Sequence, residues 1–203
     1  MVKAIVFDVG GVLIGLDLGR CIRAFEEDLG FPRIRELLDP YHQKGIYGEM
    51  EEGRLSADHF RQLVLAESRP GKQPADVDRA MAALLAGVDP RSAALLLRLR
   101  EDYPLYLGSN NNPIAMPLCL DALRQAGVDP DQTFRGQFVS CDLQLLKPSP
   151  AFYQAVVRGV GLPAEEILFV DDNGANVDAA REAGLQARLY IPGSDLSLLL
   201  ADL

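Results

Sequence analysis

The chain has 203 residues, which is enough for one sizeable hydrophobic core and one small inserted unit. Its hydrophobic content of 48% and charged content of 24% are ordinary for a globular protein, whereas its net charge of -9 argues against nucleic acid as a partner. A negatively charged substrate would therefore have to meet a local positive group or a bound cation.

Cysteine usage and hydropathy indicate a cytoplasmic protein. Cys21, Cys119 and Cys141 are scattered and form no CxxC pair, and an odd number does not suit a disulfide framework. The apolar stretch before Asp8 is too short for a signal peptide, and no run of about 18 apolar residues occurs. We therefore expect reduced thiols and no membrane partner. These features do not indicate an oligomeric state.

The chain opens with a short, continuous apolar run, Ala4–Phe7, which is typical of a strand buried on both faces of a parallel sheet. The run ends at Asp8. Open α/β sheets carry their chemistry at the carboxyl ends of their strands, which is where Asp8 would stand if this first strand is the central one. Gly10 and Gly11 then leave the backbone free to turn sharply beside a ligand. Asp is also common in turns, so a purely structural role suits this stretch equally well.

Residues 16–87 are interpreted as a helical insert. Their apolar residues recur at helical spacing after the expected cap Asp17, and turns carrying Pro or Gly divide the pieces. No β-branched apolar run typical of a buried strand occurs there. We therefore expect an all-helical cap domain over 16–87, inserted into a core formed by 1–15 and 88–203.

Two other features of the insert are expected to be structural. His42 and His59 have no Cys or His at metal-ligand spacing, so surface positions are expected for both. The acidic segment Glu49–Glu52 is expected to form a solvated face.

Beyond the insert, strands and helices alternate. Strands are expected at 104–109, 137–140, 167–170 and 186–190, and helices at 90–99, 112–127, 149–158, 174–183 and 195–203. This alternation predicts an α/β fold, namely a Rossmann-like parallel sheet with helices on both faces.

Unusual polar residues stand at the ends of three expected strands: Asp8, Ser109–Asn110 and Asp171–Asp172. Because parallel strands point the same way, these groups should converge on one rim, to which Lys147 is added by the loop after the third strand. Oxygen ligands select Mg²⁺, and the lysine can neutralise phosphoryl oxygens. The set predicts a site for Mg²⁺ and a small phosphorylated metabolite.

Each of these residues also has a structural alternative. Asp172 or Asn173 could cap the next helix, Ser109 could be a strand-end turn residue, and Lys147 could be a solvated loop lysine. Their joint occurrence, each at a strand end, favours the functional interpretation.

Four segments, in this order and at suitable spacing, resemble the four motifs of the haloacid dehalogenase-like (HAD) hydrolase superfamily: Phe7–Val12, Leu107–Asn110, Leu146–Pro148 and Phe169–Asn173. The resemblance covers the whole chain, including a helical cap inserted after the first strand. It implies a sheet in which the strands of Asp8 and Asp171 lie side by side.

The resemblance also implies the roles of the site residues. Asp8 would be a nucleophile that forms an aspartyl phosphate, with Lys147 stabilising the charge and with Ser109 and the Asn110 backbone holding the phosphate. The implied Mg²⁺ ligands are Asp8, the Gly10 carbonyl, Asp171 and, directly or through water, Asp172.

One position departs from the common pattern of that family. Most of its phosphatases carry a second Asp two residues after the nucleophile, as general acid and base, and Gly10 takes that position here. The general-acid contribution of about 10²–10⁴-fold is therefore missing or supplied elsewhere. Phosphoglucomutase-type transfer, which depends on that acid, is disfavoured. The sequence most resembles the α-D-glucose-1-phosphatase-like group, which shares this glycine.

The expected function is Mg²⁺-dependent hydrolysis of a small phosphate ester. Without an acid at Gly10 a weakly basic leaving group should be preferred, which favours a sugar 1-phosphate. One alternative is a 2-haloacid dehalogenase, which also lacks the second Asp and needs no metal. Another is a non-catalytic HAD-like module that binds a metabolite or a protein. The adjacent acids Asp171 and Asp172 favour phosphoryl transfer, because a dehalogenase has no use for both.

Overall fold

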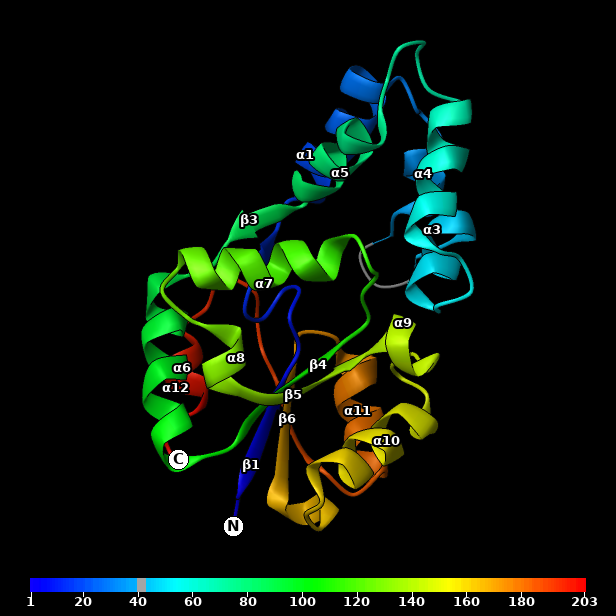
Figure 1. Cartoon of the computed structure of the whole chain (residues 1–203). Coiled ribbons are helices and arrows are strands. Elements are labelled where there is room, and N and C mark those ends of the chain that lie inside the picture. The colour runs from blue at the N-terminus through cyan, green and yellow to red at the C-terminus, as the bar shows by residue number, and fades with distance from the viewer. Residues whose placement is uncertain (40–42) are drawn as a thin grey trace.

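The computed structural model describes residues 1–39 and 43–203 (Figure 1). These residues form a parallel sheet with helices on both faces and a group of helices beyond the carboxyl ends of the strands (Figure 1). His59 is exposed, as expected, whereas His42 lies outside the described residues.

The main sheet has five strands in the order β5-β4-β1-β6-β7, and all its neighbouring pairs are parallel. The strands are β1 (Ala4–Phe7), β4 (Leu105–Ser109), β5 (Phe134–Val139), β6 (Ile167–Asp171) and β7 (Gln186–Leu189). The first strand of the chain is thus the central one, and its end lies between the ends of β4 and β6. This confirms the predicted α/β class and the predicted neighbourhood of β1 and β6.

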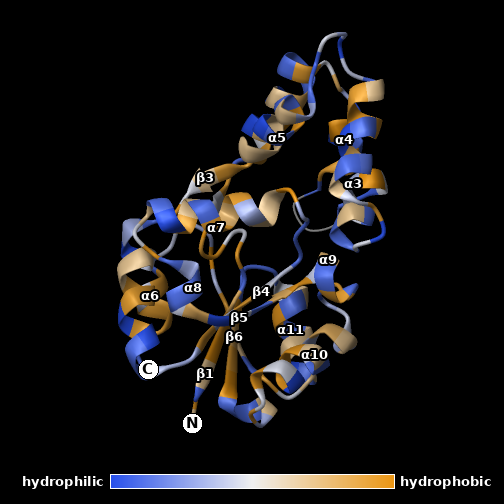
Figure 2. Cartoon of the chain, in the orientation of Figure 1, coloured by the Kyte–Doolittle hydropathy of each residue, from blue (hydrophilic) through white to orange (hydrophobic). Residues whose placement is uncertain are grey.

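Side chains of β1 alternate between two hydrophobic layers, as the pleat of a strand requires. Ile5 and Phe7 pack in the layer of α6 (Pro90–Asp102), α7 (Ala115–Gln125), α8 (Pro130–Thr133) and α12 (Leu196–Leu199). Val6 packs in the opposite layer, with α10 (Pro150–Val160) and α11 (Gly174–Glu182). Figure 2 shows the resulting arrangement, hydrophobic strands between helices of mixed hydropathy. Two short helices, α9 (Ser140–Leu143) and η2 (Ala164–Glu166), flank the sheet.

The insert has a hydrophobic core of its own. Its helices are α1 (Leu18–Arg23), the π-helix η1 (Ala24–Leu29), α2 (Ile34–Leu37), α3 (Gly45–Glu51), α4 (Ala57–Ala66) and α5 (Pro74–Ala82). Phe25, Phe31, Phe60 and Met81 are fully buried among them, and Ile114 at the start of α7 joins this cluster. The insert therefore packs on the core through α7.

Two short antiparallel strands, β2 (Gly15–Leu16) and β3 (Leu85–Gly87), join the insert to the core. The expectation of an all-helical segment over 16–87 is wrong at these two ends. Strands of two and three residues, mostly exposed, carry no alternation from which a sequence could indicate them.

Smaller differences lie at element ends. Strand β5 begins three residues before the expected Gln137, where Phe134 pairs with Leu105. Helix α12 ends at Leu199, before the expected end at Leu203. All three cysteines are free, and no helix in the described part of the chain is long and apolar enough to cross a membrane.

Candidate active site

Three carboxylates meet at the carboxyl ends of neighbouring strands. Asp8 follows β1, Asp171 ends β6, and Asp172 comes next. One oxygen from each lies within 4.8 Å of the others. They converge because Phe7 and Val170, the residues before Asp8 and Asp171, are partners in the parallel register.

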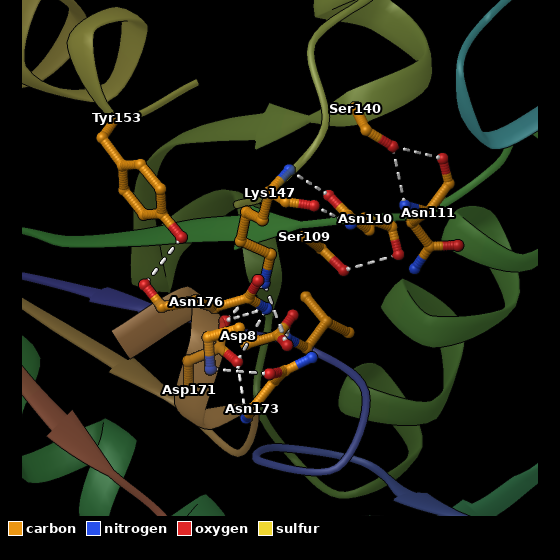
Figure 3. Close-up of polar contacts among 12 residues, drawn as sticks. Asp8, Ser109, Asn110, Asn111, Ser140, Lys147, Tyr153, Asp171, Asn173 and Asn176 are labelled. Carbon is orange, nitrogen blue, oxygen red and sulfur yellow. Dashed lines mark hydrogen bonds and ion pairs between the residues drawn. The ribbon is translucent and has the colours of Figure 1, made fainter. Parts of the chain in front are cut away.

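Lys147 lies between two of these carboxylates (Figure 3). Its Nζ is 3.0 Å from Asp8 Oδ2 and 2.6 Å from Asp171 Oδ2, and the residue is only 3% exposed. Burial alone would lower the pKa of Lys147, but the carboxylates of Asp171 and Asp8 raise it, so the ammonium stays charged. The alternative of a solvated loop lysine is therefore wrong.

Asn110 holds the main chain of Lys147. Its Nδ2 donates to the Lys147 carbonyl at 2.9 Å, and its Oδ1 accepts from the Lys147 N–H at 2.8 Å. Neighbouring Ser109 is buried at the end of β4 and lines the same cavity as Asp8. The sequence interpretation assigned only the backbone of Asn110 to the site, and the structure adds this function of its side chain.

Two residues that sequence reasoning missed orient Asp171 (Figure 3). Asn176 Nδ2 donates to both oxygens of Asp171, at 3.0 and 3.2 Å, and Tyr153 donates its hydroxyl to the Asn176 carbonyl at 2.8 Å. The backbone N–H of Asn173 also donates to Asp171 Oδ1. Asn176 lies in the first turn of α11, and Tyr153 lies within α10, outside the four motif segments, so no local signal pointed to either.

Gly11 makes room for Asp172. A Cβ at Gly11 would lie 2.2 Å from Asp172 Oδ2, and its φ of +80° also favours glycine. The cap of α11 is Asn173, whose Oδ1 accepts from the Ala175 N–H. Asp172 is thus free to face the carboxylate cluster. Gly10, in contrast, has no positive φ, and the three atoms nearest to a Cβ there would all belong to the side chain of Leu16.

The electrostatics of the cluster suit a hard cation. Burial raises the pKa of Asp8 to about 7, and Asp171 and Asp172 add to this rise while Lys147 opposes it. Burial and Asp171 likewise raise the pKa of Asp172. One lysine cannot neutralise three carboxylates, and all the donors are oxygens, so the set fits a divalent ion of the Mg²⁺ type.

The cluster opens into a cavity of about 120 Å³, which is walled by both parts of the chain. The core contributes Asp8, Gly10, Ser109 and Lys147, and α3 of the insert contributes Tyr47 and Glu51. A larger cavity of about 730 Å³ adjoins it and shares Asp172 in its lining.

Glu51 corrects a sequence expectation. The segment Glu49–Glu52 was expected to form a solvated face, but Glu51 lines the cavity, and burial, with a contribution from Asp8, raises its pKa to about 8. Ser140, also missed, donates its hydroxyl to the Glu51 carbonyl at 2.7 Å and so ties α3 to the core. Neither residue belongs to a recognisable motif, so no local signal pointed to them.

Comparison with known proteins agrees with the geometry. A sequence profile of the haloacid dehalogenase-like hydrolase family matches residues 2–184. The D-ribitol-5-phosphate phosphatase of Bacteroides thetaiotaomicron is 33% identical over 196 residues, 96% of this chain and 95% of its own. A HAD family enzyme of the same organism, crystallised with magnesium and inorganic phosphate, superposes with a TM-score of 0.87 at 29% identity, covering 98% of this chain and 99% of its own.

The L-2-haloacid dehalogenase of Xanthobacter autotrophicus is more distant, with a TM-score of 0.63 at 23% identity over 98% of this chain and 86% of its own, and shares the fold. The chain therefore belongs to the haloacid dehalogenase-like hydrolase family. Its carboxylate cluster and its relatives place it among the phosphatases of that family.

Proposed function

We propose that this hydrolase is a Mg²⁺-dependent phosphatase of small phosphate esters that works through an aspartyl phosphate on Asp8. The observation that carries the proposal is the cluster of Asp8, Asp171 and Asp172 with the Lys147 ammonium between two of them. Three carboxylates, of which Asp8 and Asp171 are buried, repel both one another and a phosphate, so the arrangement calls for a cation beside the nucleophile.

Asp8, Asp171, Asp172 and the carbonyl of Gly10 would hold the Mg²⁺. When bound, the ion neutralises these carboxylates and polarises the phosphoryl group. An oxygen of Asp8 attacks phosphorus while the ester oxygen leaves, and water then hydrolyses the aspartyl phosphate. Lys147, Ser109 and the main chain of Asn110 contact the phosphoryl oxygens as their charge develops.

We further propose that residues 16–87 act as a cap on a core formed by 1–15 and 88–203. The separate hydrophobic core of the insert and its contribution of Tyr47 and Glu51 to the cavity wall support this. A cap of this kind excludes water and selects the substrate.

The substrate we propose is a small phosphorylated metabolite, in particular a sugar phosphate. The anomeric oxygen of a sugar 1-phosphate is a weaker base than the 6-oxygen and so a better leaving group, whichever group supplies the proton. A sugar 1-phosphate should therefore react faster than a 6-phosphate. The competing substrate is a primary phosphate ester of a sugar alcohol, because one relative is named D-ribitol-5-phosphate phosphatase. If a panel of substrates shows that 6-phosphates are hydrolysed about tenfold faster than 1-phosphates, the proposal of a sugar 1-phosphate is overturned.

The test of the proposed chemistry is Asp8→Asn, assayed on p-nitrophenyl phosphate with Mg²⁺. Loss of the nucleophile should lower kcat by about 10³-fold or more. The matched control is Asp178→Asn, on the exposed side of α11, which should keep wild-type activity. Full activity in Asp8→Asn would refute the proposal. EDTA separates the alternatives, since it stops a Mg²⁺ phosphatase and leaves a haloacid dehalogenase unaffected.

A further inference from the structure

The cavity beside Asp8 contains one acid that the proposed mechanism does not use. Among the described residues, the acids that line it are Asp8 and Asp172 from the core and Glu51 from α3. Glu51 lies one helical turn after Tyr47, which lines the same cavity, so both side chains project from one face of α3.

The end of α3 that carries Glu51 is docked on the core at two points. Ser140 donates its hydroxyl to the Glu51 carbonyl at 2.7 Å and accepts from the Asn111 N–H at 3.0 Å. Gly53 lies against the backbone of Cys141, so closely that a Cβ would be 2.2 Å from the Cys141 carbonyl oxygen. The position of Glu51 relative to Asp8 is therefore set by contacts of the two parts of the chain.

Among the described residues, the carboxyl group of Glu51 has no hydrogen-bonding partner. Within 1–39 and 43–203 it makes no side-chain hydrogen bond or ion pair, whereas its neighbour Glu52 pairs with Arg54. Burial, and then the charge of Asp8, raise the pKa of Glu51 to about 8. At neutral pH the group therefore carries a proton that it can give up.

The other protic groups in the same wall are less suited to deliver a proton. The Lys147 ammonium is held by two carboxylates, and the Tyr47 hydroxyl donates to the sulfur of Met81 at 3.3 Å. Burial raises the pKa of the Cys119 thiol to about 11. Gly10 has no side chain at all.

We propose that Glu51 is the general acid and base of this enzyme and replaces, from the helical insert, the side chain that Gly10 lacks. The inference rests on the proposed phosphatase function and deepens it. It accounts for a site that has a nucleophile and a charge-stabilising lysine but no proton donor on the nucleophile's own loop.

The proton balance is complete with this residue. As Asp8 bonds to phosphorus and the P–O bond to the alcohol breaks, Glu51 gives its proton to the departing oxygen, which leaves as a neutral alcohol. Water then attacks the aspartyl phosphate, Glu51 accepts one proton of that water, and the Asp8–phosphorus bond breaks. Inorganic phosphate leaves, and both carboxyl groups return to their starting states.

The proposal is tested by assaying Glu51→Gln on two phosphate esters whose leaving groups differ in their need for a proton. A primary sugar-alcohol phosphate leaves as a strongly basic oxygen, so its kcat/KM should fall by about 10²-fold or more. p-Nitrophenolate is a stable anion that needs no proton, so kcat/KM for p-nitrophenyl phosphate should change by less than about threefold. The control is Glu49→Gln on the same helix, outside the cavity lining, which should behave as the wild type on both esters.

A second readout is the time course with p-nitrophenyl phosphate. Without a base for the water, Glu51→Gln should release a burst of about one p-nitrophenolate per enzyme and then turn over slowly. Equal loss on both esters, which a folding defect would also cause, or no loss on either, overturns the assignment of Glu51. Activity that survives Asp8→Asn in the same assay overturns the phosphatase mechanism itself, so the two failures are distinguishable.

Discussion

At the scale of single residues, the site depends on groups whose burial would be costly without their neighbours. Lys147 is almost fully buried, and its charge is sustained by Asp8 and Asp171. Asp171 in turn is held by Asn176 and by the backbone of Asn173. Removing one partner from such a network leaves a buried charge unpaired, which is far more destabilising than losing a surface ion pair.

Gly11→Ala adds a side chain that crowds Asp172 and also strains the backbone, and a control variant with the strain alone separates the two effects. The new Cβ would lie 2.2 Å from the Asp172 carboxylate, so we expect the affinity for Mg²⁺, measured by titration calorimetry, to fall by about 10–100-fold. Gly71→Ala is the control, because Gly71 also has a positive φ of +84° but nothing within 4 Å of the added carbon. An unchanged Mg²⁺ affinity in Gly11→Ala would contradict this account of the glycine.

Glu51 should make stability depend on pH. Its folded-state pKa of about 8 is above its ordinary value, so between the two values the folded state holds a proton that the unfolded state has lost. This contribution to stability therefore falls as pH rises through that window. The groups that act on Glu51 are Asp8 and Lys147 from the core and Glu52 from its own helix.

The measurement compares melting temperatures of the wild type and Glu51→Gln in EDTA. The variant has no proton to lose, so its Tm relative to the wild type should rise by a few degrees between pH 5 and pH 8.5. Because Asp8 titrates in both proteins, the difference reports the titration of Glu51 together with its interaction with Asp8. A constant difference across this range would show that Glu51 is as solvated in the folded state as in the unfolded one.

At the scale of elements, the contact between α3 and α9 decides whether the insert contributes to the site. Ser140, the first residue of α9, donates to the Glu51 carbonyl and bridges to the loop after β4 through Asn111. One hydroxyl thus connects α3 to the loop that follows Ser109. The remaining insert helices contribute mainly their shared hydrophobic core.

Ser140→Ala should loosen this contact without touching the nucleophile. The Asn111 N–H and the Glu51 carbonyl lose a buried partner, so the free energy of unfolding should fall by about 1–3 kcal/mol in urea titration. On a primary phosphate ester kcat should fall as well, though less than in Glu51→Gln. Ser68→Ala serves as the control, because the Ser68 hydroxyl, just beyond the end of α4, donates to the Val64 carbonyl four residues before it and does not connect the insert to the core. Wild-type kcat in Ser140→Ala would mean that this hydroxyl does not position Glu51.

At the scale of the whole molecule, Mg²⁺ should stabilise the fold. The ion would bind where three carboxylates from two strands meet, an arrangement that the unfolded chain lacks. At a concentration of about 100 Kd, binding should add about 2.7 kcal/mol, a rise in Tm of roughly 5–10 °C over the EDTA value. Asp171→Asn should abolish most of this rise, whereas the exposed Asp178→Asn should retain it. A Mg²⁺-independent Tm in the wild type would contradict the proposed ligand set.

The sequence was sufficient for those features that local patterning dictates. Runs such as Ala4–Phe7, buried on both faces, and the alternation of strands with capped helices specify a parallel sheet, because each strand must be covered twice. Parallel strands then bring their carboxyl ends to one rim, which made the proximity of Asp8 and Asp171 predictable. The order and spacing of the motifs indicated Ser109, Asn110, Lys147 and Asp172 as further candidate site residues.

Only the tertiary structure showed the groups that reach the site from elsewhere in the chain. Glu51 stands in an acidic segment that has the composition of a solvated face, and it lines the cavity because α3 docks on the core, where Ser140 binds the Glu51 carbonyl. Asn176 and Tyr153 support Asp171 through contacts between separate elements. The short pair β2–β3 forms only because its two halves, some 70 residues apart in sequence, meet in the fold. Local pattern encodes which face of an element is buried, whereas the partner that covers it depends on the packing of the whole chain.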